Sequence, residues 1–257
     1  MHLTTTPSLA VPSRTLPRCV TVVVCCAVLF GALLALVEAR WGPLAGLDRG
    51  WTDAEHRYAT RHTVWIAAVQ TLSDIGGTVT MRTLLGLAAG WLWLIGARAL
   101  AGWAAAQCLI GWGLLWVLKL SVGRARPHFV DPVAHASNPG FPSGHAMASA
   151  ITCVALVWLL RPHSNGAARV AAAGVAALAV TAIGWTRIAL GVHWPSDVLA
   201  GWLAAGVVLG AVTAAVELWR PGALARDVRR VNWRTRPRVQ RVLATGASGE
   251  DPSADLR

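Results

Sequence analysis

The chain has 257 residues, of which 55% are hydrophobic and only 14% are charged, and its formal net charge is +11. This composition argues against an ordinary soluble domain and is typical of a polytopic membrane protein. Excess positive charge can indicate nucleic-acid binding. Here the arginines concentrate in loops and in the C-terminal tail, so we interpret them as membrane topology and lipid-headgroup contacts, with no nucleic-acid partner.

Six apolar segments predict an all-α bundle of about six transmembrane helices. The longer segments approach the roughly 20 residues that span a bilayer. The segments cover residues 19–37, 83–97, 99–118, 146–160, 170–185 and 198–216. All five cysteines lie within apolar segments and lack disulfide or zinc spacing, so we interpret them as small core residues.

The flanking regions complete a three-part organisation. Residues 1–18 predict a cytoplasmic N-terminal segment, and residues 19–218 predict a single six-span domain. Residues 219–257 predict a basic cytoplasmic tail, because eight arginines lie between Arg220 and Arg241.

The region between the first two spans is less regular. Residues 38–62 are polar and carry Trp41, Trp51 and Tyr58, which predicts an external segment resting on the membrane interface. Residues 64–72 are apolar but short, and either an interfacial helix or the lip of the second span fits them. Arg82 directly precedes the second span and is interpreted as an extension of it that snorkels to the surface.

The distribution of arginines orients the chain in the cell membrane. Six spans place both termini on one side, and the positive-inside rule makes that side the cytoplasm. Residues 119–145 and 186–197 then lie outside. The 40 residues between His145 and Thr186 suffice for about two crossings at 1.5 Å per residue. Both polar stretches are therefore predicted to form one site on the extracytoplasmic face.

The first polar stretch carries three cations, Lys119, Arg124 and Arg126, within eight residues. One cation at the end of a span is usually an anchor. Three on the side where positive charge is disfavoured indicate an anion, because the arginine fork fits phosphate oxygens and lysine adds a point charge.

The same stretch ends in Pro142-Ser143-Gly144-His145. A turn that leads into a helix presents unpaired backbone N–H groups and a positive dipole end, which suit a phosphate. The Ser143 hydroxyl can donate a hydrogen bond, and Gly144 permits a close backbone approach. Taken alone, His145 could equally be a structural histidine at a helix start.

The second polar stretch pairs a histidine with an acid. His193 and Asp197 are four residues apart, and a carboxylate can hold one imidazole nitrogen while the other acts as nucleophile or base. Asp197 could also be a helix cap.

Together, in this order, the three blocks resemble the type 2 phosphatidic acid phosphatase superfamily, whose pattern is K-x6-R-P, then P-S-G-H, then S-R-x5-H-x3-D. The resemblance covers residues 119–197 and departs from the pattern only at Thr186, where serine is usual. It implies that His193 attacks phosphorus to form a phosphohistidine, that Asp197 orients it and that His145 protonates the leaving group. The implied phosphate-binding residues are Lys119, Arg126, Ser143, Gly144 and Arg187.

The resemblance implies a lipid phosphatase without metal or cofactor. Phosphatidic acid, a polyprenyl diphosphate such as undecaprenyl diphosphate, and phosphatidylglycerol phosphate all fit as substrates. The alternatives are a zinc hydrolase using His145, His193 and Asp197, a vanadate haloperoxidase with the same motifs, and a transporter or non-catalytic membrane protein. Neither substrate choice nor oligomeric state follows from the sequence.

Overall fold

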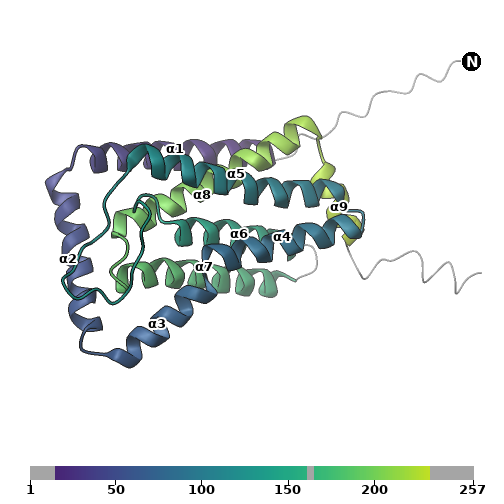
Figure 1. Cartoon of the computed structure of the whole chain (residues 1–257). Coiled ribbons are helices and arrows are strands. Elements are labelled where there is room, and N and C mark those ends of the chain that lie inside the picture. Colours follow the sequence, from purple (N-terminus) through teal and green to yellow (C-terminus); the bar gives the residue numbers. More distant parts are fainter. Residues whose placement is uncertain (1–14, 161–164, 232–257) are drawn as a thin grey trace, which may run out of the picture.

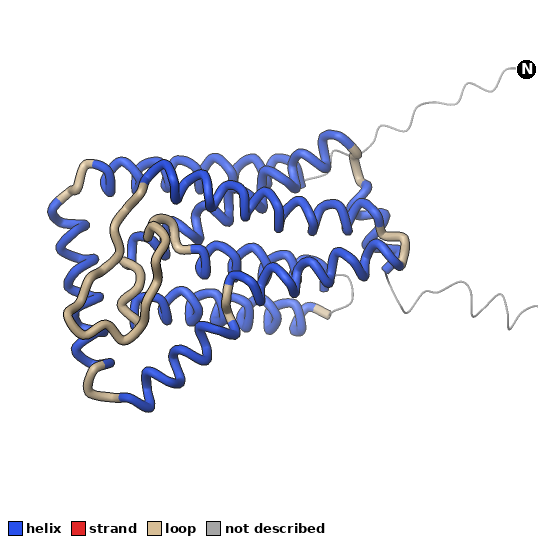
Figure 2. The backbone as a smooth tube through the Cα atoms, viewed as in Figure 1, coloured by secondary structure: helices blue, strands red, loops and turns tan. Residues whose placement is uncertain are grey.

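The computed structural model describes residues 15–160 and 165–231, and within these ranges the chain is helical, with no strand (Figure 2). The elements are α1 (Thr15–Glu38), α2 (Gly42–Ala59), α3 (Thr63–Ile75), α4 (Thr78–Leu94), α5 (Arg98–Val122), α6 (Gly144–Leu160), α7 (Gly166–Ala189), α8 (Pro195–Trp219) and α9 (Ala223–Val231). The predicted all-α class is confirmed.

Six of these helices, α1 and α4 to α8, form a bundle along one axis (Figure 1). α2 crosses one end of this bundle, and α3 slants back from α2 to α4. The long loop between α5 and α6 lies at the same end as α2. The start of α1 and the short helix α9 lie at the opposite end.

Four helices are long and apolar enough to cross a membrane: α1, α5, α7 and α8. The other two predicted spans correspond to α4 and α6, which have 17 residues each, somewhat fewer than the roughly 20 of a typical span. The count of six spans therefore stays a prediction. The helices also extend beyond the predicted spans, so that Lys119 lies in the last turn of α5 and Arg187 in the last turn of α7.

The polar segment predicted to rest on the interface contains an 18-residue helix, α2. Asp48, Thr52 and His56 recur every fourth residue and are buried, whereas Trp51 and Tyr58 are exposed. α2 is thus amphipathic, with a polar buried face. The short apolar segment next to it is a separate helix, α3, which Gly76 and Gly77 separate from α4.

Close contact between α8 and the start of α6 brings the two polar stretches together. A Cβ atom at Gly201 would lie 2.7 Å from the Ser143 carbonyl oxygen and 3.0 Å from Ala146 Cβ, so only glycine permits this approach. The Ser143 N–H also donates to the Asp197 carbonyl oxygen at 2.9 Å. The predicted meeting of the two stretches at one end of the bundle follows from this packing.

The predicted tail contains an element that the sequence analysis missed. Residues 223–231 form α9, and Asp227 Oδ2 accepts hydrogen bonds from the backbone N–H groups of Ala99 (2.7 Å) and Leu100 (3.2 Å). This carboxylate satisfies two otherwise unpaired donors at the start of α5. Most of the predicted N-terminal segment, residues 1–14, and the rest of the tail, residues 232–257, lie outside the described residues.

Candidate active site

A cavity of about 280 Å³ is lined by residues at the start of α4 and α6 and at the end of α5 and α7. In Figure 1 these helix ends lie at the end of the bundle that α2 crosses. Residues from all three motif blocks line the cavity wall: Lys119, Arg126, Gly144, His145, Arg187 and His193. Four polar residues that the sequence analysis did not assign to the site line it as well: Thr78, Arg82, His135 and Asn138. The motif residues, which are up to 74 positions apart in the chain, therefore share one chamber.

His193 lies in the loop between α7 and α8 and is buried. Its Nε2 is 2.9 Å from the Arg126 guanidinium, and its Nδ1 is 3.4 Å from Asp197 Oδ2. Arginine can only donate, so Nε2 accepts and the ring proton belongs on Nδ1, facing the carboxylate. The reactive lone pair is thus on the nitrogen that faces the cations.

Burial lowers the pKa of His193 well below its ordinary 6.5, and the charges of Arg126, Arg187 and Lys119 lower this pKa further. The imidazole is therefore neutral near pH 7. A neutral ring is the state that a nucleophilic histidine needs.

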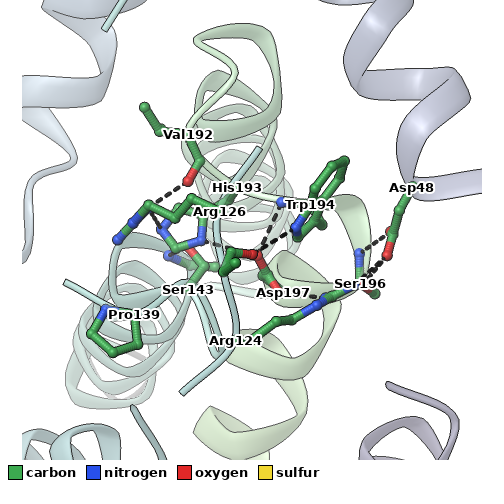
Figure 3. A network of polar contacts seen from close by, with 12 residues as sticks. Asp48, Arg124, Arg126, Pro139, Ser143, Val192, His193, Trp194, Ser196 and Asp197 are labelled. Carbon is green, nitrogen blue, oxygen red and sulfur yellow. Dashed lines mark hydrogen bonds and ion pairs between the residues drawn. The ribbon is translucent and has the colours of Figure 1, made fainter. Parts of the chain in front are cut away.

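Asp197 has two roles at the start of α8 (Figure 3). Its Oδ2 accepts a hydrogen bond from the Trp194 backbone N–H at 3.0 Å and also faces His193, while its Oδ1 accepts from Arg124 at 2.6 Å. The carboxylate therefore caps the helix and orients the histidine at once.

Arg124 does not line the cavity. From the sequence it is grouped with Lys119 and Arg126 as three cations that indicate an anion-binding site. Its guanidinium binds Asp197 and also Asp48 of α2, 2.8 Å away (Figure 3). Asp48 is buried and accepts two further hydrogen bonds from Ser196, one from N–H at 3.0 Å and one from the hydroxyl at 2.6 Å. Arg124 is therefore neutralised by the carboxylates of Asp48 and Asp197, so it is not left to bind a ligand anion.

Asn138, in the loop before α6, links two of the cavity cations. Its Oδ1 accepts from Lys119 Nζ at 3.2 Å and from the Arg126 guanidinium at 2.7 Å. Arg126 also donates to the Asn138 and Val192 carbonyl oxygens, and Lys119 donates to that of Pro139. The third cation, Arg187, donates to the Ser73 hydroxyl, and its buried Nε has no hydrogen-bond partner among the residues that the structure describes.

The hydroxyl-bearing motif residues Ser143 and Thr186 are not among the residues that line the cavity. The Ser143 hydroxyl is fully buried and accepts a long, 3.5 Å hydrogen bond from the Ala146 N–H in the first turn of α6. The Thr186 hydroxyl donates to the Ile183 carbonyl oxygen at 2.6 Å, a back-bond that serine or threonine can make within a helix. The predicted contact of Ser143 with phosphate stays a prediction.

Among the described residues, no three His, Cys, Asp or Glu side chains are grouped as ligands for a metal ion. His145, His193 and Asp197, the set that a zinc hydrolase would use, are thus not arranged as such a group. Asp197 points both of its oxygens at protein donors instead.

The sequence pattern of the PAP2 superfamily matches residues 90–221, about half of the chain. The chain belongs to this superfamily, which confirms the resemblance seen in the motifs, and it is a multi-pass membrane protein.

One relative is phosphatidylglycerophosphatase B of Bacillus subtilis (strain 168), which is 38% identical over 90 residues. The match covers 33% of this chain and 42% of that protein, so the chain matches less than half of the relative's length. The crystal structure of a transmembrane PAP2-type phosphatidylglycerolphosphate phosphatase from Bacillus subtilis superposes with a TM-score of 0.65 at 22% identity. The superposition covers 76% of this chain and 96% of the Bacillus subtilis chain, and it shows that the two proteins share a fold.

Proposed function

We propose that the chain is an integral membrane lipid phosphatase that hydrolyses a phosphate monoester or diphosphate through a phosphohistidine. One observation carries the proposal: neutral His193 faces a cavity with three motif cations, and Asp197 holds its far nitrogen. Membership of the PAP2 superfamily and the similarity to a phosphatidylglycerophosphatase support the same chemistry.

In the proposed reaction, Lys119, Arg126 and Arg187 bind the phosphoryl oxygens and stabilise the charge that builds up in the transition state. Arg126 must exchange its hydrogen bond with Nε2 for one with phosphate, which frees the lone pair. Nε2 then forms a bond to phosphorus while the bond to the leaving oxygen breaks, and protonated His145 gives that oxygen a proton. Burial and the nearby cations lower the pKa of His145 to about 3, so this role requires the negative charge of the bound phosphate, which offsets those cations and raises the pKa again.

The second half of the reaction restores the enzyme. Water attacks the phosphohistidine and loses a proton to His145, and the N–P bond breaks to release inorganic phosphate. Asp197 stabilises the positive charge on the imidazole when Nε2 is bonded to phosphorus. Each residue thus ends in its starting state.

We further propose that the site is extracytoplasmic and that both termini are cytoplasmic. The arginine distribution supports this orientation. The arrangement of the bundle is consistent with it, because the start of α1 and α9 lie at one end and the cavity lies near the other (Figure 1).

The test is phosphate release by the purified protein in detergent, with phosphatidic acid, phosphatidylglycerol phosphate and a polyprenyl diphosphate as substrates. We expect turnover of at least one lipid, inhibition by vanadate and full activity in a chelator. His193→Ala should abolish turnover, whereas His62→Ala, an exposed control histidine, should not. Strict magnesium dependence, or an active His193→Ala protein, would contradict the proposal.

A further inference from the structure

A fourth cation, Arg82, lines the cavity but belongs to none of the three motif blocks. Arg82 lies on α4, one turn after Thr78, and both residues are on the cavity wall. As expected from the sequence, the second span extends past Arg82, since α4 begins at Thr78. The structure also places Arg82 on the cavity wall.

Arg82 differs from the motif cations in its partners. Lys119, Arg126 and Arg187 each donate to protein oxygens. In the described part of the chain, no hydrogen bond or ion pair holds the Arg82 guanidinium, although the residue is only partly exposed. A cation kept partly out of water without a counterion is costly, so this position favours an anion supplied by a ligand.

The position of Arg82 indicates which part of a ligand it would meet. It also lines an apolar crevice between α4, α5 and α6, which shares Leu115 and Gly144 with the polar cavity. The crevice is narrow, about 20 Å³, and Trp112 on its wall is 49% exposed. Arg82 thus lies at the junction between the phosphate-binding cavity and an apolar surface suited to the first carbons of a lipid tail.

We propose that Arg82 binds a second phosphate of the substrate, the one that lies between the scissile phosphate and the lipid tail. The inference rests on the proposed function and narrows its substrate class to lipids with two phosphate groups. In a polyprenyl diphosphate the second phosphate is bonded directly to the scissile one, and in phosphatidylglycerol phosphate a glycerol separates the two. Phosphatidic acid has no second phosphate for Arg82 to bind.

The test compares kcat/KM for these three lipids in the wild type, Arg82→Gln, Arg82→Lys and the control Arg98→Gln. Arg98 is an exposed cation at the start of α5, stacked over Trp93. A charge-assisted hydrogen bond is lost in Arg82→Gln, so kcat/KM for a two-phosphate lipid should fall roughly 10- to 100-fold, mainly through KM. The loss for phosphatidic acid should be much smaller, Arg82→Lys should recover part of the activity, and Arg98→Gln should match the wild type.

If Arg82→Gln lowers kcat/KM selectively for the polyprenyl diphosphate, the second phosphate that Arg82 binds is part of a diphosphate. If the selective loss is on phosphatidylglycerol phosphate, it is a phosphodiester. Equal losses on one- and two-phosphate lipids, or no loss on any, would overturn the assignment of Arg82. If the wild type hydrolysed none of the lipids, the proposed function itself would fail.

A binding measurement separates these failures, because it does not need turnover. In the His193→Ala background, pyrophosphate should raise the melting temperature in detergent more than inorganic phosphate does. Adding Arg82→Gln should remove this preference while leaving a response to phosphate. A preference for pyrophosphate that survives Arg82→Gln would overturn the inference.

Discussion

At the residue scale, the two motif histidines of the cavity, His145 and His193, are proposed to have different tasks, and the leaving group can separate them. A lipid alkoxide needs a proton to leave, so His145→Ala should lower kcat/KM for a lipid phosphate by about 10²–10⁴-fold, as is typical of general acid catalysis. A nitrophenolate leaves without a proton, so the same variant should retain much more activity on a nitrophenyl phosphate that the site accepts. His193→Ala should lose both activities, because no leaving group replaces the attacking atom.

The measurement is the ratio of kcat/KM for the two esters in each variant, with folding checked by size exclusion in detergent. Equal losses on both esters in His145→Ala would show that His145 binds phosphate or supports the structure instead.

The pKa of His193 gives a second prediction. Burial and the nearby cations lower it below 6.5, so protonation of His193 should not limit activity until the pH is well below 6.5. In the unfolded chain the His193 imidazole takes up a proton near its ordinary pKa of 6.5, whereas in the folded protein it stays neutral to lower pH. Protonation of His193 in the unfolded state therefore lowers the free energy of unfolding as the pH falls below 6.5. Arg126→Gln removes one of the responsible charges and should raise this pKa.

The check is a pH titration of the labelled histidine rings by NMR in detergent, with the His193 signal assigned through His193→Asn. Arg98 lies at the start of α5, at the end of the bundle opposite the cavity. The control Arg98→Gln should therefore leave the pKa of His193 unchanged. An unchanged His193 titration in Arg126→Gln would show that the charge of Arg126 does not contribute to this pKa.

At the scale of elements, α2 braces the site from outside the bundle. Asp48 holds both Arg124 and Ser196, which fixes the groups behind Asp197. On the same helix, His56 Nε2 lies 3.0 Å from Asp131 Oδ1 and the His56 ring stacks on Phe129 at 3.8 Å. α2 therefore holds the α5–α6 loop as well as the start of α8.

Asp48 should act as a positioning residue, because it touches Arg124 but not the cavity. Asp48→Asn weakens the buried ion pair to Arg124, and we expect kcat to fall by about tenfold, which corresponds to about 1.4 kcal/mol of transition-state stabilisation, with little change in KM. Asp53→Asn, an exposed site on the same helix, is the matched control. Equal kcat values in the two variants would show that α2 only covers the bundle.

The sequence predicted six residues of the cavity wall, because these motif residues lie at the ends of apolar segments that are easily located. It could not predict Asp48 or Asn138, whose roles depend on contacts with residues 76 and 12–19 positions away that periodicity does not encode. Asp48, Thr52 and His56 are spaced four residues apart, and this spacing could have indicated a helix in this segment. The extension of the second span past Arg82 agrees with α4, which begins at Thr78, but nothing in the sequence places Arg82 on the cavity wall.

At the scale of the whole molecule, the orientation in the membrane is open to a direct test. A protease-cleavable tag after Arg257 should be protected in intact cells, because the positive-inside rule places that end in the cytoplasm. The same tag after Val130, a fully exposed residue in the α5–α6 loop, should be cleaved from outside. The reverse pattern would contradict the proposed orientation.

The hydrogen bond between Arg126 and His193 Nε2 bears on whether the proposed phosphatase would react with the carboxylic esters of the surrounding bilayer. Those esters surround the protein in vast excess, and a bare neutral imidazole could be acylated by them. In the unliganded protein the guanidinium occupies the attacking lone pair, and an uncharged carbonyl competes poorly for a cation that a phosphate dianion binds strongly. Discrimination against carboxylic esters would then arise when the nucleophile is uncovered, because only an anion would free it.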